Sequence, residues 1–151
     1  MKMRGGKASA HRRKRPFKIF LSHAPADTVL ARKIRSLLVR HSSSSVFTNE
    51  DLSAGENWRS KLQKELETAD VFVALLTPES VGSSLVLQET GAAWALDKPI
   101  IPLVTRLDIL DRFPIQLRGY NAFEPADLDT PAGSEQFAAA LEHTLAASHV
   151  V

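Results

Sequence analysis

The sequence predicts an α/β protein in which helices cover both faces of a five-stranded parallel sheet. Two observations carry this prediction. The runs 71–76 and 99–104 are hydrophobic at almost every position, as in parallel strands that are covered on both faces. Segments with apolar residues at helical spacing alternate with such runs from Phe17 onward. Right-handed crossovers in such a fold place ligand sites beyond the carboxyl ends of the strands.

The first half of the chain is expected to hold two strands and two helices. The first strand is Phe17–Leu21, and Asp27 is the expected N-cap of the helix that follows. The second strand is 46–48, and the loop 49–56 leads to a helix that begins near Asn57. The apolar stripes of the two helices are Leu30, Ile34, Leu37 and Leu38, and then Trp58, Leu62 and Leu66. We interpret Trp58 as a core anchor of the second helix in preference to a platform for a nucleotide.

The second half continues the alternation. After the strand 71–76 come a helix over residues 84–96 and the strand 99–104. A short irregular helix over 106–112 and a short edge strand over 120–123 follow. The last helix is expected to begin at a cap, Ser134, and its apolar stripe is Phe137, Leu141 and Leu145.

One carboxylate stands within an apolar helical segment. Glu89 lies in the predicted helix 84–96, whose side chains are apolar nearly all round, so this helix should be largely buried. A carboxylate is rarely buried without a partner or a chemical task. The simpler interpretation is that Glu89 sits at the rim and reaches water, or pairs with an arginine. The alternative is a functional role, and this helix alone leaves both open.

The charge of the chain is unevenly distributed. Residues 1–16 carry seven lysines and arginines and no acidic residue, whereas the whole chain has a net charge of +2, so residues 17–151 carry −5. We expect residues 1–16 to be a flexible, solubilising tail before a domain that spans 17–148. Contact of the tail with nucleic acid, an anionic surface or an acidic partner is the less favoured alternative, because no Phe, Tyr or Trp interleaves the charges to stack on bases.

Several classes of protein are disfavoured by what the sequence lacks. With no cysteine, neither a disulfide framework nor a Cys-based metal site is possible, and the five histidines have no metal-ligand spacing. His23 is therefore interpreted as a loop residue and not as a metal ligand. No Gly-x-Gly-x-x-Gly or Walker sequence is present, and no apolar run is long enough for a membrane span or follows the basic N-terminus as in a signal peptide. A cytoplasmic location is expected.

The segment 70–104 resembles the third strand, third helix and fourth strand of a TIR domain of the bacterial type. Thr77-Pro78 corresponds to the family's Ser-Pro, Leu85 to its Trp and Glu89 to its glutamate, and Lys98 begins a Lys-Pro-Ile-Ile-Pro sequence. Upstream, Phe20-Leu21-Ser22-His23 resembles the first-strand box and Leu52-Ser53-Ala54-Gly55 the loop after the second strand. The order and spacing of these boxes, from Phe17 to about Ala147, carry the resemblance.

The resemblance implies a flavodoxin-like fold and a set of site residues. In TIR domains that cleave NAD+, the glutamate matched by Glu89 is the catalytic residue, and NAD+ is a substrate, so neither a resident cofactor nor a metal is expected. Leu85 stands where the family commonly has Trp. Leucine can pack against a base but, unlike tryptophan, cannot stack on it. The residues expected to line the NAD+ site are Ser22, His23, Ala24, Pro25, Ser53 and Leu85, and those of the self-association loop are Asn49, Asp51, Leu52 and Gly55.

Two functions follow from this resemblance. The first is an NAD+ glycohydrolase or ADP-ribosyl cyclase that acts in bacterial antiviral defence or as an effector. The second is a scaffold that binds other TIR domains without chemistry. Both imply homotypic contacts, and neither requires a membrane or nucleic acid as a partner. The carboxylate at Glu89 favours the enzyme, since one carboxylate suffices to cleave a bond whose leaving group, nicotinamide, departs neutral.

Overall fold

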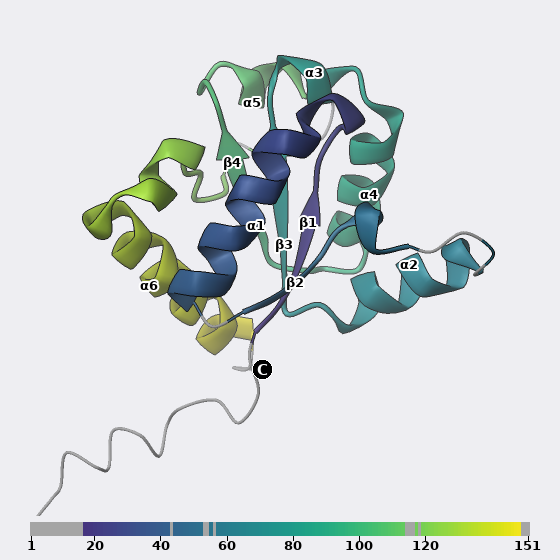
Figure 1. Cartoon of the computed structure of the whole chain (residues 1–151), viewed down its shortest axis with the longest axis horizontal. Helices are drawn as coiled ribbons and strands as arrows, with labels where there is room; N and C mark the ends of the chain where they lie inside the picture. The colour runs from purple at the N-terminus through teal and green to yellow at the C-terminus, as the bar shows by residue number, and fades with distance from the viewer. Residues whose placement is uncertain are drawn as a thin grey trace, which may run out of the picture.

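In the computed structural model of the chain, residues 17–42, 44–52, 55, 57–113, 117 and 119–148 are described. Within them, four parallel strands form one sheet in the order β2-β1-β3-β4 (Figure 1). Their bounds are β1 Lys18–Ser22, β2 Ser45–Phe47, β3 Val71–Leu76 and β4 Ile100–Val104. The order reverses between β1 and β3, so the chain is doubly wound as predicted, and such reversal points are where ligands bind in open α/β sheets.

The prediction of a fifth strand over 120–123 is wrong. Only Phe123 pairs with the sheet, through an isolated parallel bridge to Leu103. Its N–H donates to the Pro102 carbonyl at 2.9 Å, and its own carbonyl accepts from the Val104 N–H at 2.7 Å. The pairing stops there because a 3-10 turn, η4 (Pro125–Asp129), begins two residues later with a proline that fixes its own φ and has no N–H to donate.

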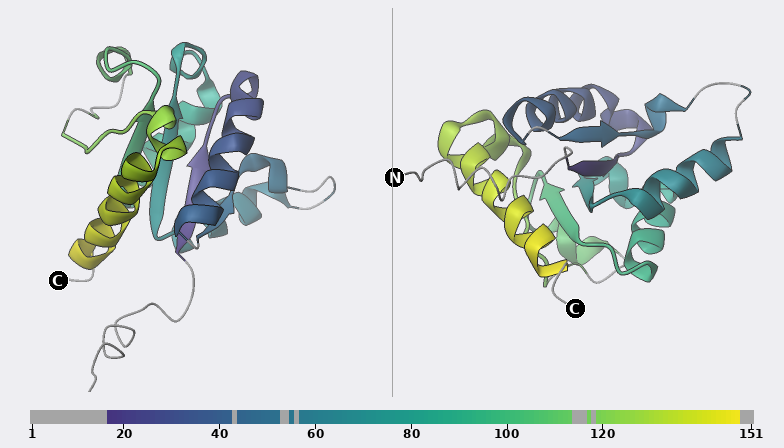
Figure 2. Two further views of the ribbon diagram at one scale, coloured as in Figure 1. Left: turned by 60° about the vertical axis from the view of Figure 1, so that its left-hand side comes forward. Right: turned by 90° about the horizontal axis from the view of Figure 1, so that it is seen from below.

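The helices form one layer on each face of the sheet (Figures 1 and 2). α1 (Thr28–Ser42) and α6 (Pro131–Ser148) cover one face, and α2 (Trp58–Thr68) and α4 (Ser84–Ala95) cover the other. The short helices α3 (Pro78–Val81) and α5 (Ile109–Arg112) follow β3 and β4 at the carboxyl ends of the strands. Two 3-10 turns, η2 (Pro25–Asp27) and η3 (Asn49–Asp51), follow β1 and β2 at the same end. No helix of the described residues is both long and apolar enough to cross a membrane.

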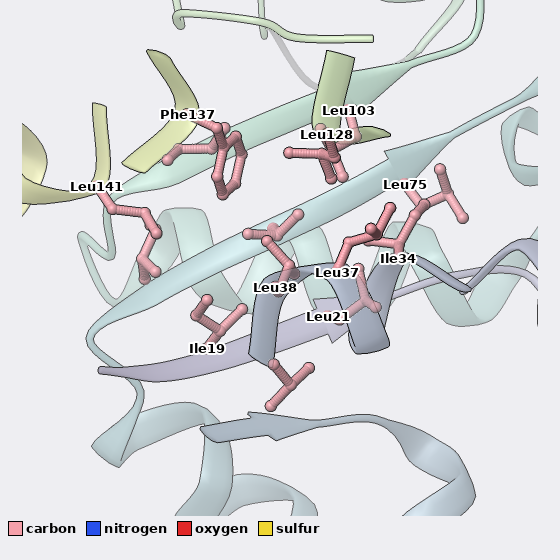
Figure 3. Close-up of a cluster of buried hydrophobic side chains, with 14 of the residues drawn as sticks. Ile19, Leu21, Ile34, Leu37, Leu38, Leu75, Leu103, Leu128, Phe137 and Leu141 are labelled. Carbon is pink, nitrogen blue, oxygen red and sulfur yellow. The ribbon is translucent and has the colours of Figure 1, made fainter. Parts of the chain in front are cut away.

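The face under α1 and α6 is packed mainly with aliphatic side chains, together with the rings of Phe17 and Phe137 (Figure 3 labels Phe137). Alternate residues of the strands point into it, and helix residues spaced three and four apart meet them. Phe137 of α6 contacts Phe123 edge to face, with ring centroids 5.3 Å apart. The labelled core residues are Ile19, Leu21, Ile34, Leu37, Leu38, Leu75, Leu103, Leu128, Phe137 and Leu141.

On the opposite face, Phe20 and Phe72 from neighbouring strands stack with ring centroids 5.5 Å apart. Leu66 of α2 and Val86 of α4 belong to the same buried cluster. Trp58, predicted to anchor α2 in the core, is instead 57% exposed. The reason is geometric: Trp58 is the first residue of α2, and this end of the helix projects away from the sheet (Figure 2).

The start of the second helix, predicted near Asn57, is confirmed, whereas the start of the last helix differs from the prediction. Asn57 caps α2, since its side-chain oxygen accepts a hydrogen bond from the Ser60 N–H. Ser134, predicted to begin the last helix, lies inside α6. Thr130 takes that role: its hydroxyl accepts a hydrogen bond from the Gly133 N–H at 3.0 Å, and Pro131 occupies the first helical position.

Candidate functional site

Glu89 is buried in the helix that covers β1 and β3. Ser83 caps α4 by accepting from the Val86 N–H, and the helix then turns one face, which includes Glu89, toward the sheet. The Glu89 side chain is 3% exposed. Neither simple interpretation from the sequence holds in the described structure, because the carboxylate does not lie at the rim and no arginine contacts it there.

Two neutral side chains hold the Glu89 carboxylate. The Ser22 hydroxyl donates to Oε1 at 2.6 Å, and the Asn49 amide donates to Oε2 at 2.5 Å. Ser22 is the last residue of β1 and Asn49 the first of η3, so the carboxyl ends of two neighbouring strands converge on one helix residue. Each carboxylate oxygen has two lone pairs, so each retains the capacity to accept a further hydrogen bond.

Burial raises the pKa of the Glu89 carboxyl above its ordinary value of 4.5. The hydrogen bonds from Ser22 and Asn49 and the nearby imidazole of His23 act in the opposite direction, because each stabilises the ionised form. Burial has the largest effect of these. The site therefore holds a carboxylate that is weakly solvated, oriented from two sides and more basic than a surface glutamate.

The turn that carries Asn49 is fixed at several points. Thr48 caps η3 and exchanges hydrogen bonds with Asp51 across the turn. Glu50 accepts two hydrogen bonds from the Arg32 guanidinium of α1, at 2.7 and 3.2 Å, and Asp51 pairs with Arg35 at 3.0 Å. These contacts tie the segment after β2 to α1 and so keep the Asn49 amide against Glu89.

The segment after β1 forms the neighbouring side of the site. His23 and Ala24 are buried, and the His23 Nδ1 lies 2.8 Å from the Ala24 carbonyl oxygen. Pro25 begins η2 and is exposed. At the end of η2, just before α1, the Asp27 carboxylate accepts a hydrogen bond from the Thr77 hydroxyl at 2.6 Å. This bond links the segments that follow β1 and β3.

Two of the residues predicted to line the NAD+ site act on the Glu89 carboxylate. Ser22 contacts its carboxylate, and the ring of His23 is close enough to act on its pKa. Leu85 stands one turn earlier on α4 and is half-buried. Ser53 lies outside the described residues. Their roles toward NAD+ stay predictions.

Asn49 was expected only in a self-association loop, together with Asp51, Leu52 and Gly55. Its side chain is also a direct partner of Glu89, which sequence reasoning missed. Forty positions separate the two residues, and the polar residues around Asn49 are ordinary for a loop. The contact could therefore be suggested only if the order of the strands in the sheet were already known. Asp51 faces Arg35, and Gly55 adopts a positive φ of 87°, a conformation that favours glycine.

No cluster of three or more histidines or acidic residues with metal-binding geometry occurs among the described residues. A hollow of about 430 Å³ is lined by Lys98, Tyr120 and His143, among others, near the amino end of β4. A smaller one of about 240 Å³ lies between α1 and η4. Neither hollow is lined by Glu89, Ser22 or Asn49.

The family model that describes the TIR domain matches residues 19–150. The chain belongs to the TIR domain family. This match extends from β1 to α6 and confirms the resemblance that the sequence motifs carry. No sequence among the curated proteins matches the chain.

Solved structures agree with this TIR domain in fold. The TIR domain of the Toll-related receptor TRR-2 from Hydra magnipapillata is 15% identical and superposes with a TM-score of 0.66, over 83% of this chain and 98% of that one. A 2-deoxyribosyltransferase from Leishmania mexicana is 19% identical, with a TM-score of 0.56 over 83% and 98% of the two chains. A 2-deoxyribosyltransferase from Bacillus psychrosaccharolyticus is 17% identical, with a TM-score of 0.52 over 74% and 90%. At these identities the likeness concerns the fold.

Proposed function

We propose that this TIR domain cleaves NAD+ at the bond between nicotinamide and ribose, with Glu89 as the catalytic residue. The observation that carries the proposal is the Glu89 carboxylate itself: buried, held by Ser22 and Asn49, and placed at the carboxyl ends of the strands. A carboxylate in such a position is costly to bury, and a chemical task accounts for it better than a structural one.

The chemistry requires one carboxylate and no general acid. The C1′–N bond breaks and its electron pair goes to the nicotinamide nitrogen, so the leaving group departs neutral. The ribose is left with oxocarbenium character, which the ionised Glu89 stabilises in surroundings of low dielectric constant. Water then attacks C1′ to give ADP-ribose and a proton, or a nitrogen of the adenine attacks to give a cyclic isomer.

Ser22 and Asn49 are positioning residues in this mechanism. Ser22 belongs to a central strand and donates to one carboxylate oxygen, while Asn49 donates to the other from a turn that α1 holds in place. Together they fix the plane of the carboxylate and favour its ionised form, which is the form that the reaction needs.

The first test is mass spectrometry of concentrated protein with NAD+, which follows nicotinamide and the ADP-ribose products. We expect nicotinamide release by the wild type and its loss in a folded Glu89→Ala variant. The mass of the product separates hydrolysis from cyclisation. An unchanged rate in the folded variant would remove Glu89 from the mechanism.

A second test uses Asn49→Asp, which places a second carboxylate against Glu89. Like charges at this distance raise the pKa of the pair, so the rate of nicotinamide release should start to rise at a higher pH than in the wild type. Asn57→Asp, which retains a cap on α2 away from the site, is the matched control and should keep the wild-type pH profile. The same profile in both variants would show that Asn49 does not govern the ionisation of Glu89.

A scaffold that binds other TIR domains is the second candidate function. Two large aromatic side chains support it, because Trp58 and Trp94 are 57% and 59% exposed on the helices α2 and α4. Exposed tryptophans are common at protein interfaces. Weaker self-association of Trp58→Ser, measured by analytical ultracentrifugation, would support this function. Since an enzyme that acts after assembly would behave in the same way, only turnover of NAD+ separates the two candidates.

A further inference from the structure

The turn η3 depends on polar contacts for its place in the molecule, because none of its residues is buried. The Asp51 N–H donates to the Thr48 carbonyl at 2.9 Å. The Leu52 N–H donates to the Asn49 carbonyl at 3.2 Å. These bonds fix the shape of the turn but not its position against the rest of the chain. Burial of apolar surface, which holds the neighbouring strands, contributes little to placing the Asn49 side chain.

Two arginines of α1 supply the contacts that place the turn. Arg32 and Arg35 are three residues apart and so lie on the same side of the helix. Arg32 donates from Nε and Nη2 to the two carboxylate oxygens of Glu50, at 3.2 and 2.7 Å. Arg35 donates from Nη1 to Asp51 at 3.0 Å. The helix is a firm support for these contacts, since Ile34, between the two arginines, is buried in the core.

The Arg32–Glu50 pair lies next to Asn49 in sequence and has a bidentate geometry. Two parallel hydrogen bonds match the fork of the guanidinium to the carboxylate, which adds both strength and direction to the contact. The hydrogen bonds from Arg32 also lower the pKa of the Glu50 carboxyl, so both partners are charged at neutral pH. Glu50 directly follows Asn49, whose amide donates to Glu89. A displacement of Glu50 therefore moves the donor to one of the Glu89 oxygens.

We propose that the Arg32–Glu50 ion pair positions Asn49 for the cleavage of NAD+, so that the rate of the reaction depends on a contact at the surface of the molecule. This inference rests on the proposed function, because it names what holds a partner of the same catalytic carboxylate. Arg32 is a positioning residue and needs no contact with NAD+. The side chains of the pair are 67% and 31% exposed, so salt screens their attraction and should weaken the effect.

A double-mutant cycle on the ion pair tests the inference. Arg32→Gln and Glu50→Gln should each lower kcat for nicotinamide release about 2–5-fold, the size expected of one exposed ion pair, with KM nearly unchanged. The double variant should be no slower than either single variant. Reversal of the pair, Arg32→Glu with Glu50→Arg, should recover part of the rate. A higher KM with an unchanged kcat in Arg32→Gln would mean that Arg32 binds NAD+ directly, and would overturn the inference.

The dependence on salt gives a second readout. Raising NaCl from about 0.1 M to about 1 M shortens the Debye length from about 10 Å to about 3 Å, so the ratio of the wild-type rate to the Arg32→Gln rate should fall toward one. The ratio is informative because any effect of salt on NAD+ itself is common to both proteins. A ratio that does not change with salt would contradict an electrostatic role for the pair.

Lys33→Gln is the matched control. Lys33 follows Arg32 on the same helix and also forms an exposed ion pair, but its partner at 3.1 Å is Asp129 of η4 and not the turn that carries Asn49. This variant should keep the wild-type kcat at every salt concentration, and sedimentation should show the same assembly for all of the variants. An equal loss of rate in Lys33→Gln, or a loss in Arg32→Gln that follows a loss of assembly, would overturn the inference.

Nuclear magnetic resonance of the Asn49 side-chain amide measures its position without turnover. The signals are assigned by their absence in Asn49→Ser, and Glu89→Ala gives their position without the carboxylate. In Arg32→Gln the signals should shift toward their position in Glu89→Ala, whereas in Lys33→Gln they should stay at the wild-type position.

The two measurements together separate failure of this inference from failure of the proposed function. If the wild type cleaves NAD+ and Arg32→Gln changes neither the rate nor the amide signals, the inference fails and the function stands. Signals that shift while the rate is unchanged also overturn the inference, because the position of Asn49 would then not govern cleavage. If cleavage is absent but the signals shift, the placing of Asn49 by the ion pair stands alone. Neither cleavage nor a shift overturns both.

Discussion

The helices α1 and α4 lie on opposite faces of the same sheet and bury different kinds of side chain. The buried residues of α1 whose side chains are described are all apolar: Ala31, Ile34, Leu37 and Leu38. Those of α4 are Val86, Glu89, Thr90 and Ala93, of which two are polar. The Thr90 hydroxyl has no hydrogen-bond partner, and burial raises the pKa of Glu89.

Under the proposed function, this contrast marks where the fold buries a polar group for a site. α1 follows the ordinary rule that a helix buries its apolar stripe against a sheet. α4 departs from that rule at Thr90 and at Glu89, and at Glu89 the end of β1 and the turn after β2 provide hydrogen-bond donors. Local departures of this kind are expected at functional sites, where chemistry and not packing decides the residue.

Among substitutions on α1 and α4, we expect the largest effect from a change at Glu89, and we expect it in the rate of nicotinamide release. Glu89→Ala should reduce nicotinamide release by about 10²–10⁴-fold, equivalent to roughly 3–5 kcal/mol of transition-state stabilisation. Far-ultraviolet circular dichroism of the same sample should remain that of the wild type. An inactive variant that is also unfolded would mean that Glu89 is structural and that α4 differs from α1 only in composition.

Leu38→Ala makes the opposite test on α1. Leu38 is 1% exposed within the core under α1 and α6, so its truncation leaves a cavity and should cost about 2–5 kcal/mol of unfolding free energy. Urea denaturation measures the loss. The rate of nicotinamide release per folded molecule should be unchanged, because Leu38 lies on the other face of the sheet. A loss of rate without a loss of stability would contradict the division of roles between the faces.

The sequence predicts the core of the fold better than the contacts of the candidate site. Hydrophobic runs and helical stripes locate β3, β4, α1 and α4 within a few residues, because burial of apolar surface selects those patterns. The errors occur where local pattern is weak. Residues 120–123 contribute one β-bridge because a turn that begins with a proline follows them. Trp58 belongs to the apolar stripe of α2, but it is the first residue of the helix, at the end that projects away from the sheet.

The site is less predictable for a related reason. Glu89 is conspicuous because its neighbours in sequence are apolar, and the family resemblance gives it a role. Asn49 has no such background, and its contact with Glu89 depends on a sheet order that places β2 beside β1. In His23, Nδ1 has a hydrogen-bond partner and Nε2 has none. This depends on the side-chain conformation of His23 and on the position of the Ala24 carbonyl, which cannot be predicted from the spacing of residues in the sequence.

The pH dependence of stability tests directly whether burial raises the pKa of Glu89. Because burial raises its pKa in the folded state, folding favours the protonated form. The stability contribution is therefore fully present below the unfolded pKa, about 4.5, and is lost as the pH rises through the folded value. Glu89→Gln cannot ionise. The melting temperature of Glu89→Gln minus that of the wild type should increase as the pH is raised from 4.5 and then become constant. A difference that decreases over this interval would mean that the donors outweigh burial.

The smallest effect should come from Thr90, the other polar residue that α4 buries. Its hydroxyl is fully buried without a partner, so Thr90→Val removes an unsatisfied group and retains the shape of the side chain. We expect a gain of about 1 kcal/mol in the free energy of unfolding by urea denaturation. The matching change on α1 is Ala31→Ser, which introduces a buried hydroxyl there and should lower stability instead. If Thr90→Val destabilises the protein, the hydroxyl has a partner that binds it in solution, and the polar character of α4 extends beyond Glu89.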